Sequence, residues 1–93
     1  MAFGWNANTG LAARATAIGN GADAQFDDSL ALGFGATTTA ANQFMLGTGT
    51  NIYVLPGLNG ASTGAQGAVT GLVTTDANGT LGSDTTTLST VST

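Results

Sequence analysis

Charged residues are nearly absent from this chain. Its 93 residues include five Asp, no Glu and a single basic residue, Arg14, which gives a formal net charge of −4. Proteins that bind nucleic acid or an anionic membrane surface use clusters of Lys and Arg against the phosphates. The composition therefore excludes both nucleic acid and an anionic membrane surface as partners.

Cysteine and histidine are missing as well. The chain can therefore form neither disulfides nor thiolate metal sites. Its acidic residues Asp23, Asp27 and Asp28 lack the DxDxDG spacing of an EF-hand. We expect no metal and no cofactor, with a calcium loop around Asp76 as the alternative.

Groups that could act as a catalytic base are equally scarce. Ser and Thr are abundant, but the chain has no His, Cys, Lys or Glu to activate them. We therefore predict that the protein is not an enzyme. The catalytic alternative is a carboxylate pair of the glycosidase type, drawn from Asp23, Asp27 and Asp28.

Long apolar runs and large side chains are also lacking. No stretch reaches the roughly 18 apolar residues of a membrane-spanning helix, and the opening MAFGWNANTG lacks the basic and apolar regions of a signal peptide. With 16 Ala, 15 Gly and 17 Thr, an isolated globule would bury little apolar area. We expect a piece of a longer protein, stabilised by close-packed repeats or by oligomerisation.

What the chain does contain is a repeat built on one glycine. The segments MAFGWNA, TAIGNGA, LALGFGA and FMLGTGT align on Gly4, Gly19, Gly33 and Gly47, at spacings of 15, 14 and 14 residues. This period suits one coil of a β-solenoid, with two short strands and two turns. Glycine supplies the turn because it tolerates positive φ and the close approach of a neighbouring coil.

The strand of each coil is apolar on both faces. In SLALG, Leu30 and Leu32 point to one face and Ala31 to the other, because side chains alternate along a strand. A strand of this kind must be covered on both sides, so we expect one face inside the coil and the other against a second copy. The residues predicted for the core or for the interface between copies are Ile18, Leu30, Leu32, Phe44 and Leu46.

The segments between these strands, ANTGLAA, ADAQFDD and ATTTAAN, are predicted to form the solvent-facing strand and its turns. We expect Arg14 to pair with Asp27 or Asp28 one coil along. Gln25, Phe26 and Asp27 form a candidate ligand surface, because exposed aromatic residues are enriched at binding hot spots. The alternative is that the aromatic residues pack at the interface between copies or cover the end of the stack.

Four copies in phase resemble the head repeats of YadA-like trimeric autotransporter adhesins of Gram-negative bacteria, whose usual pattern is Ser-Val-Ala-Ile-Gly. Residues 29–33, SLALG, fit it with a conservative change in each apolar position, and the resemblance covers residues 1–51. It implies a left-handed parallel β-roll from each of three chains around a threefold axis. It also implies a bacterial surface location, an outer-membrane anchor further along the full protein, and adhesion to host matrix, cells or surfaces. Trp5 and Phe34 depart from the family pattern, in a position that is usually small.

The second half of the chain has a different pattern. In NIYVLPGLNG, a β-prone run ends at Pro56-Gly57, and the segment is similar to one that follows the head repeats in some alphaproteobacterial members of this family. NGASTGAQGA is predicted to be a loop. Asn78-Gly79 between two β-prone runs predicts a hairpin, and the spacing of Leu81, Leu88 and Val91 is compatible with the start of a coiled coil.

These observations predict an all-β protein made of a left-handed parallel β-roll of about 14-residue coils, intertwined as a homotrimer. Its parts would be the head repeats (1–51), a connector (52–68), a hairpin neck domain (69–84) and the start of a stalk or a disordered tail (85–93). The predicted function is non-catalytic attachment to host matrix, cells or abiotic surfaces. The alternatives are a trimeric phage tail fibre or spike and an ice-binding solenoid. An ice-binding solenoid would carry Thr at the same position of successive coils, but ADAQ in one coil stands where the next coil has ATTT.

Overall fold

The computed structural model describes residues 1–85 of the chain. The chain divides into two compact units, Met1–Tyr53 and Val54–Thr93, and each is described by itself. In the part from Met1 to Thr85, no helix is both long enough and apolar enough to cross a bilayer.

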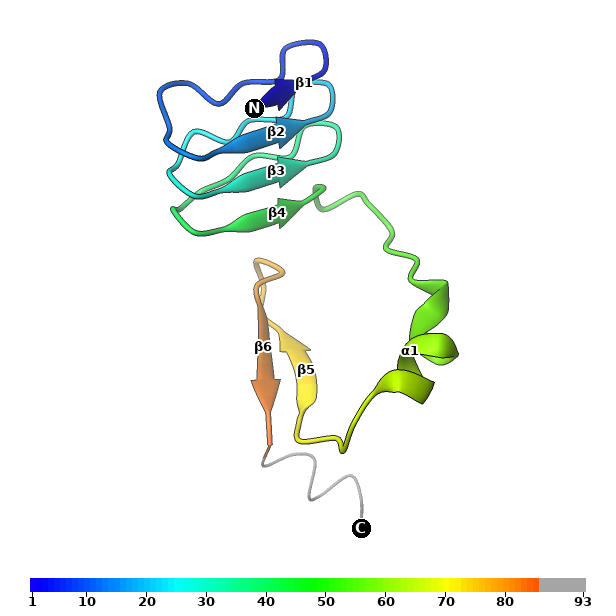
Figure 1. The fold of residues 1–93 in the computed structure, drawn as a ribbon. Coiled ribbons are helices and arrows are strands. Elements are labelled where there is room, and N and C mark those ends of the chain that lie inside the picture. The colour runs from blue at the N-terminus through cyan, green and yellow to red at the C-terminus, as the bar shows by residue number, and fades with distance from the viewer. Residues whose placement is uncertain (86–93) are drawn as a thin grey trace. The chain divides into compact units, whose positions relative to one another are not determined.

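The first unit is built on a parallel sheet of four very short strands in the order β1-β2-β3-β4 (Figure 1). The strands are β1 (Ala2–Phe3), β2 (Thr16–Ile18), β3 (Leu30–Leu32) and β4 (Phe44–Leu46). Residues at equivalent repeat positions pair directly, so Leu30 lies opposite Phe44 and Ala31 opposite Met45. One repeat therefore contributes one strand, and the 14-residue spacing sets the register of the sheet.

Each strand is followed by one of the four aligned glycines, all with positive φ. A Cβ on Gly4 would lie 2.9 Å from the carbonyl of Gly19, and a Cβ on Gly19 would lie 2.8 Å from the carbonyl of Gly33. Real side chains do not make contacts this short with backbone, so only glycine fits at these two positions. The glycine stack thus lets successive turns lie directly on one another.

The interior of this unit contains almost nothing larger than alanine. Ala17 and Ala31 are fully buried, whereas Leu32 and Phe44 on the opposite face of the sheet are 41% and 72% exposed. The alternation along β2 and β3 therefore places alanine inward and the larger side chains outward, and in β4 the inward residue is Met45, which packs against the alanines. The buried apolar residues are Ala15, Ala17, Ala22, Ala24, Ala31 and Ala36.

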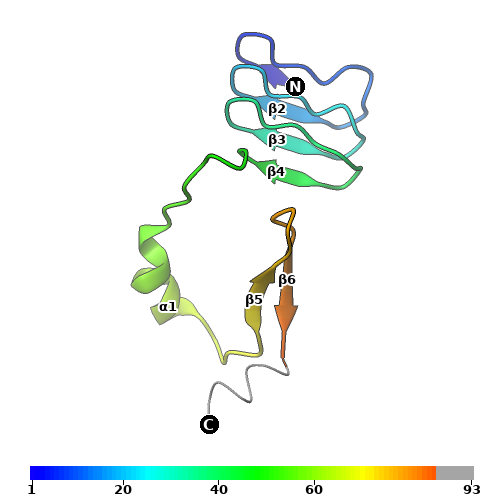
Figure 2. The ribbon, with the colours of Figure 1, turned by 180° about the vertical axis from the view of Figure 1, so that it is seen from behind.

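The chain returns from each strand to the next through segments that run as coil (Figure 2). They touch one another through two isolated parallel bridges, Asn8 with Asp23 and Asp23 with Thr37. The solvent-facing strand predicted for these segments is absent from residues 1–85. Single bridges replace it because Gly, Asn and Thr turns interrupt the backbone before a ladder can form.

The predicted fold class, a left-handed parallel β-roll of about 14-residue coils, was wrong, while the predicted assembly as a homotrimer stays a prediction. The structure has a four-stranded parallel sheet, a separate two-stranded antiparallel sheet and a short helix within one chain. The returning segments run as coil and contribute Ala22, Ala24 and Ala36 to the buried alanine cluster, which contains no large side chain that could separate two full sheets. The large apolar residues stay outside this interior.

The second unit contains helical turns as well as strands. The 3-10 helix η1 (Pro56–Asn59) begins at the single proline, and α1 (Ala61–Ala65) follows it; proline is favoured at a first helical position because it has no N–H to satisfy there. The loop predicted for this stretch was therefore wrong in part. The predicted coiled-coil positions Leu88 and Val91 lie outside the described residues.

Two antiparallel strands complete this unit, β5 (Leu72–Thr75) and β6 (Leu81–Asp84). The turn between them is organised by Asp76, whose Oδ1 accepts hydrogen bonds from the backbone N–H of Asn78 and of Thr80, both at 2.9 Å. Gly79 completes the turn with φ of 82°. The carboxylate of Asp76 thus has a structural role in closing the hairpin.

Candidate binding surface at the Phe26 corner

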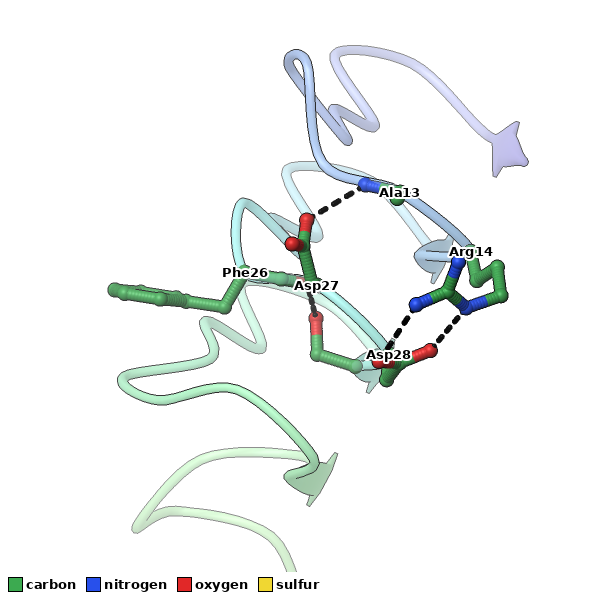
Figure 3. Close-up of polar contacts among 6 residues, drawn as sticks. Ala13, Arg14, Phe26, Asp27 and Asp28 are labelled. Carbon is green, nitrogen blue, oxygen red and sulfur yellow. Dashed lines mark hydrogen bonds and ion pairs between the residues drawn. The ribbon is translucent and has the colours of Figure 1, made fainter.

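The turn between β2 and β3 carries the three residues predicted as a ligand surface. Phe26 is 41% exposed, and its ring points away from the neighbouring side chains (Figure 3). The hydroxyl of Ser29, which is buried, donates a hydrogen bond of 2.6 Å to the carbonyl of Phe26. The exposed ring is therefore mounted on a backbone segment that is anchored from within. We call Gln25, Phe26 and Asp27 the Phe26 corner.

Asp27 ties this corner to the repeats on either side. Its Oδ1 accepts a hydrogen bond of 2.8 Å from the backbone N–H of Ala13, fourteen residues earlier. Its carbonyl accepts a hydrogen bond of 3.1 Å from the backbone N–H of Asn42 in the next repeat. Asp27 thus holds three successive turns in line.

Gln25 is also engaged within the chain. Its Nε2 donates a hydrogen bond of 3.1 Å to Oδ2 of Asp23. Of the three residues of the Phe26 corner, Gln25 and Asp27 each use a side-chain atom to organise the turn, and Phe26 presents a large exposed apolar surface. The corner is suited to contact through an aromatic ring on a preformed backbone.

Arg14 and Asp28 form an ion pair beside the corner. Arg14 Nε lies 2.5 Å from Asp28 Oδ1, and Arg14 Nη2 donates to Asp28 Oδ2 at 3.0 Å, so the guanidinium and the carboxylate meet along two parallel bonds (Figure 3). The predicted pairing of Arg14 with Asp27 or Asp28 is confirmed for Asp28. Asp27 instead meets the amide of Ala13.

The ion pair shifts both partners toward their charged forms. The hydrogen bond from Arg14 lowers the pKa of the Asp28 carboxyl, against a smaller opposing effect of desolvation. The hydrogen bond to Asp28 raises the pKa of Arg14 in turn. Because both side chains are exposed, water screens the attraction and the pair contributes little to stability.

The three carboxylates considered for catalysis each meet a different partner. Asp23 meets Gln25, Asp27 meets the amide of Ala13, and Asp28 meets Arg14. The Oδ1 atom of Asp23 is buried and has no hydrogen-bond partner among the described residues. Between residues 1 and 85, no group of three or more His, Cys, Asp or Glu is placed to hold a metal ion.

A second candidate surface is the outer face of the parallel sheet. Register places Phe3, Ile18, Leu32 and Leu46 in one row across the four strands. Leu30 and Phe44 form a shorter row beside it. We call this set the apolar sheet face, and it includes all five residues predicted for the core or trimer interface: Ile18, Leu30, Leu32, Phe44 and Leu46.

The apolar sheet face is open in the single chain. Phe3, Phe44 and Leu46 are exposed over at least half of their surface, and Ile18 and Leu30 are half-buried. Charged residues are absent from all four strands. Contiguous exposed apolar surface of this kind marks an interaction site in soluble proteins.

Two residues at the end of the sheet, Asn51 and Tyr53, were not among the predicted site residues. The hydroxyl of Tyr53 donates a hydrogen bond to the carbonyl of Leu46, the last residue of β4. Asn51 Oδ1 accepts a hydrogen bond of 2.7 Å from the backbone N–H of Thr48. The signal available in the sequence was the single tyrosine, which lies six residues after the last repeat glycine, Gly47.

Comparisons of the chain with protein-family models, with curated proteins and with solved structures found no match. The function proposed below therefore depends on the residues and on the resemblance of the repeats.

Proposed function

We propose that this chain is part of a non-catalytic bacterial surface adhesin, and that it works as a homotrimer. In this proposal the apolar sheet face joins the copies, and the Phe26 corner of each copy is available to an external partner. The partner is a host matrix protein, a host cell or an abiotic surface. The full-length protein is held at the outer membrane by an anchor that lies beyond this chain.

The observation that carries the proposal is the contrast between the two faces of the parallel sheet. The inward face buries Ala17 and Ala31 completely and Met45 in part, while the outward face leaves Phe3, Leu32, Phe44 and Leu46 accessible to water. Burial stabilises by about 25 cal/mol for each Å² of apolar surface, so most of the available stabilisation lies on the uncovered face. Covering that face with further copies supplies what the alanine interior lacks.

Further copies suit this face better than a charged partner does. The strands carry no charge, and the chain has only six charged residues, so copies meet with little repulsion. Three is the number of copies that the resemblance of the SLALG repeats implies. Three Phe26 corners on one particle then act together, and avidity strengthens binding even where a single contact is weak.

The experiment that tests assembly is the solution mass of the 93-residue chain, measured by light scattering on a sizing column. We expect the mass of three 9.0 kDa chains, with a β-type circular dichroism spectrum in the same peak. Leu32→Asp should abolish assembly, because it would bury an unpaired carboxylate between copies. Leu11→Asp is the matched control, since Leu11 is fully exposed outside the sheet. A single-chain mass for the unaltered protein, or an unchanged mass for Leu32→Asp, would contradict the proposal.

Adhesion is tested on the same particles. Phe26→Ala should reduce retention on immobilised matrix protein, on cells or on an abiotic surface, while the mass stays that of the unaltered protein. Phe34→Ala removes another exposed aromatic ring and serves as the control. Equal losses for the two variants would remove the special role of the Phe26 corner.

A further inference from the structure

The backbone of each repeat is joined to the next by a hydrogen bond at the repeat glycine. The N–H of Gly19, Gly33 and Gly47 donates to the carbonyl of Phe3, Ile18 and Leu32 respectively, each at 2.8 Å. The equivalent carbonyl on β4 belongs to Leu46. Its donor is not a backbone N–H but the side-chain hydroxyl of Tyr53.

The space over the last glycine is filled in the same way. Gly47 lies on Gly33, and a Cβ on Gly33 would be 3.4 Å from the Gly47 Cα. Over Gly47 there is no further glycine: a Cβ there would lie 2.2 Å from Asn51 Oδ1 and 2.9 Å from the Tyr53 hydroxyl. Two side chains therefore occupy the position of a following repeat.

The conformation of this segment is held by its own hydrogen bonds. Asn51 accepts from the N–H of Thr48 through its side chain and donates to the Thr48 carbonyl through its backbone, at 2.7 and 3.2 Å. The turn brings Asn51 over Gly47 and directs Tyr53 back to Leu46. Both contacts arise within one short loop.

We propose that Asn51 and Tyr53 form a cap that closes the β4 edge against the β1 edge of a second copy of this chain. The proposal goes beyond the assembly suggested above, because it concerns the end of the sheet and not its apolar face. An exposed sheet edge is a template for pairing with another chain. The cap occupies the Leu46 carbonyl, one of the acceptors that such a chain would use.

The β1 edge is complementary to the β4 edge. The carbonyls of Met1 and Phe3 accept from the N–H of Ala17 and of Gly19, and in a parallel ladder the N–H and C=O of the intervening Ala2 then face away from β2. Gly4 has no side chain to obstruct the approach of Gly47. Pairing of β1 on β4 in the repeat register would bring the Gly4 N–H to the Leu46 carbonyl. Such a head-to-tail contact does not close on itself and produces linear multimers.

The test compares the 93-residue chain with its Asn51→Ala/Tyr53→Phe variant by light scattering over a tenfold concentration range. We expect the mass of the unaltered chain to stay constant, whatever its number of copies. The mass of the variant should roughly double or more across the range, as expected of an open-ended contact. Circular dichroism and hydrogen exchange at the Gly47 N–H establish that the sheet of the variant remains folded.

Adding Ala2→Pro to the variant is the control for the docking edge. Proline removes an N–H that faces away from β2, and proline is a natural means of blocking an edge strand. The triple variant should return to the constant mass of the unaltered chain. A folded Asn51→Ala/Tyr53→Phe variant whose mass does not rise would overturn the proposal. Growth that persists with Ala2→Pro would equally overturn it, because the added copies would then pair elsewhere.

Discussion

Substitution of Gly19 by alanine is the sharpest test of the way in which the repeats stack. Gly19 has φ of 128°, and a Cβ there would lie 2.8 Å from both the carbonyl carbon and the carbonyl oxygen of Gly33. Backbone cannot move aside as a flexible side chain can. The new methyl group must therefore separate β2 from β3 or distort the turn that follows β2.

Two costs combine in this variant. A non-glycine residue held in a sparsely populated backbone region costs about 1–3 kcal/mol, and inserting a methyl group into a closely packed site costs about 1–3 kcal/mol more. Native domains have only about 0.05–0.15 kcal/mol of stability per residue. For a unit that ends at Tyr53, we therefore expect Gly19→Ala to remove most or all of the folding free energy.

Gly21→Ala is the matched control, two residues further along. Gly21 also has positive φ, at 71°, but the nearest heavy atom to an added Cβ is the Gly35 nitrogen at 3.9 Å, an ordinary contact. This variant has the backbone cost alone, about 1–2 kcal/mol for a left-handed conformation. Urea unfolding followed by circular dichroism at equal chain concentrations separates the two. Equal midpoints for Gly19→Ala and Gly21→Ala would refute the argument that backbone contact between glycines limits the stack.

Three further predictions concern single side chains. Ser29→Ala should cost about 1 kcal/mol in urea unfolding, because the Phe26 carbonyl loses its hydrogen bond from a buried hydroxyl; an unchanged midpoint would show that water replaces it freely. Asp28→Asn should change little at neutral pH. Because Arg14 lowers the folded pKa of Asp28 below its ordinary value of 3.8, the pair stabilises the fold above that value and its contribution is lost as pH falls through the folded pKa. The variant should lack this part of the acid dependence of the urea midpoint, and an identical acid profile would contradict it. Asp76→Ala should weaken the β5–β6 hairpin, seen as faster amide hydrogen exchange across its turn, since two backbone N–H groups lose their acceptor.

Much of the structure of the first unit can be predicted from the sequence, because the pairing of repeats depends on spacing along the chain. The glycine spacing predicts which residues pair, and the structure places Leu30 opposite Phe44 as that spacing requires. Alternation within SLALG likewise separates Ala31, which is fully buried, from Leu32, which is not. Both follow from strand geometry alone, in which successive side chains point to opposite faces.

Other features depend on contacts between residues that no local pattern relates. The composition showed that the core would be poor in large side chains, but not that the returning segments would pair through isolated bridges and single hydrogen bonds in place of a second sheet. The sequence also did not show that the adjacent carboxylates of Asp27 and Asp28 would have different partners. Asp28 has φ of 57° and meets Arg14, while Asp27 meets the amide of Ala13.

The same distinction applies to the end of the sheet. The sequence by itself determined the period, the face of each strand that would be small, and the near absence of charge. The tertiary structure alone decided that Tyr53 returns to the Leu46 carbonyl and that Asn51 covers Gly47. The reason is physical. The repeat pattern specifies how one repeat pairs with the next, but no further repeat follows β4. The groups that bond to its open edge therefore depend on where the following loop runs in space.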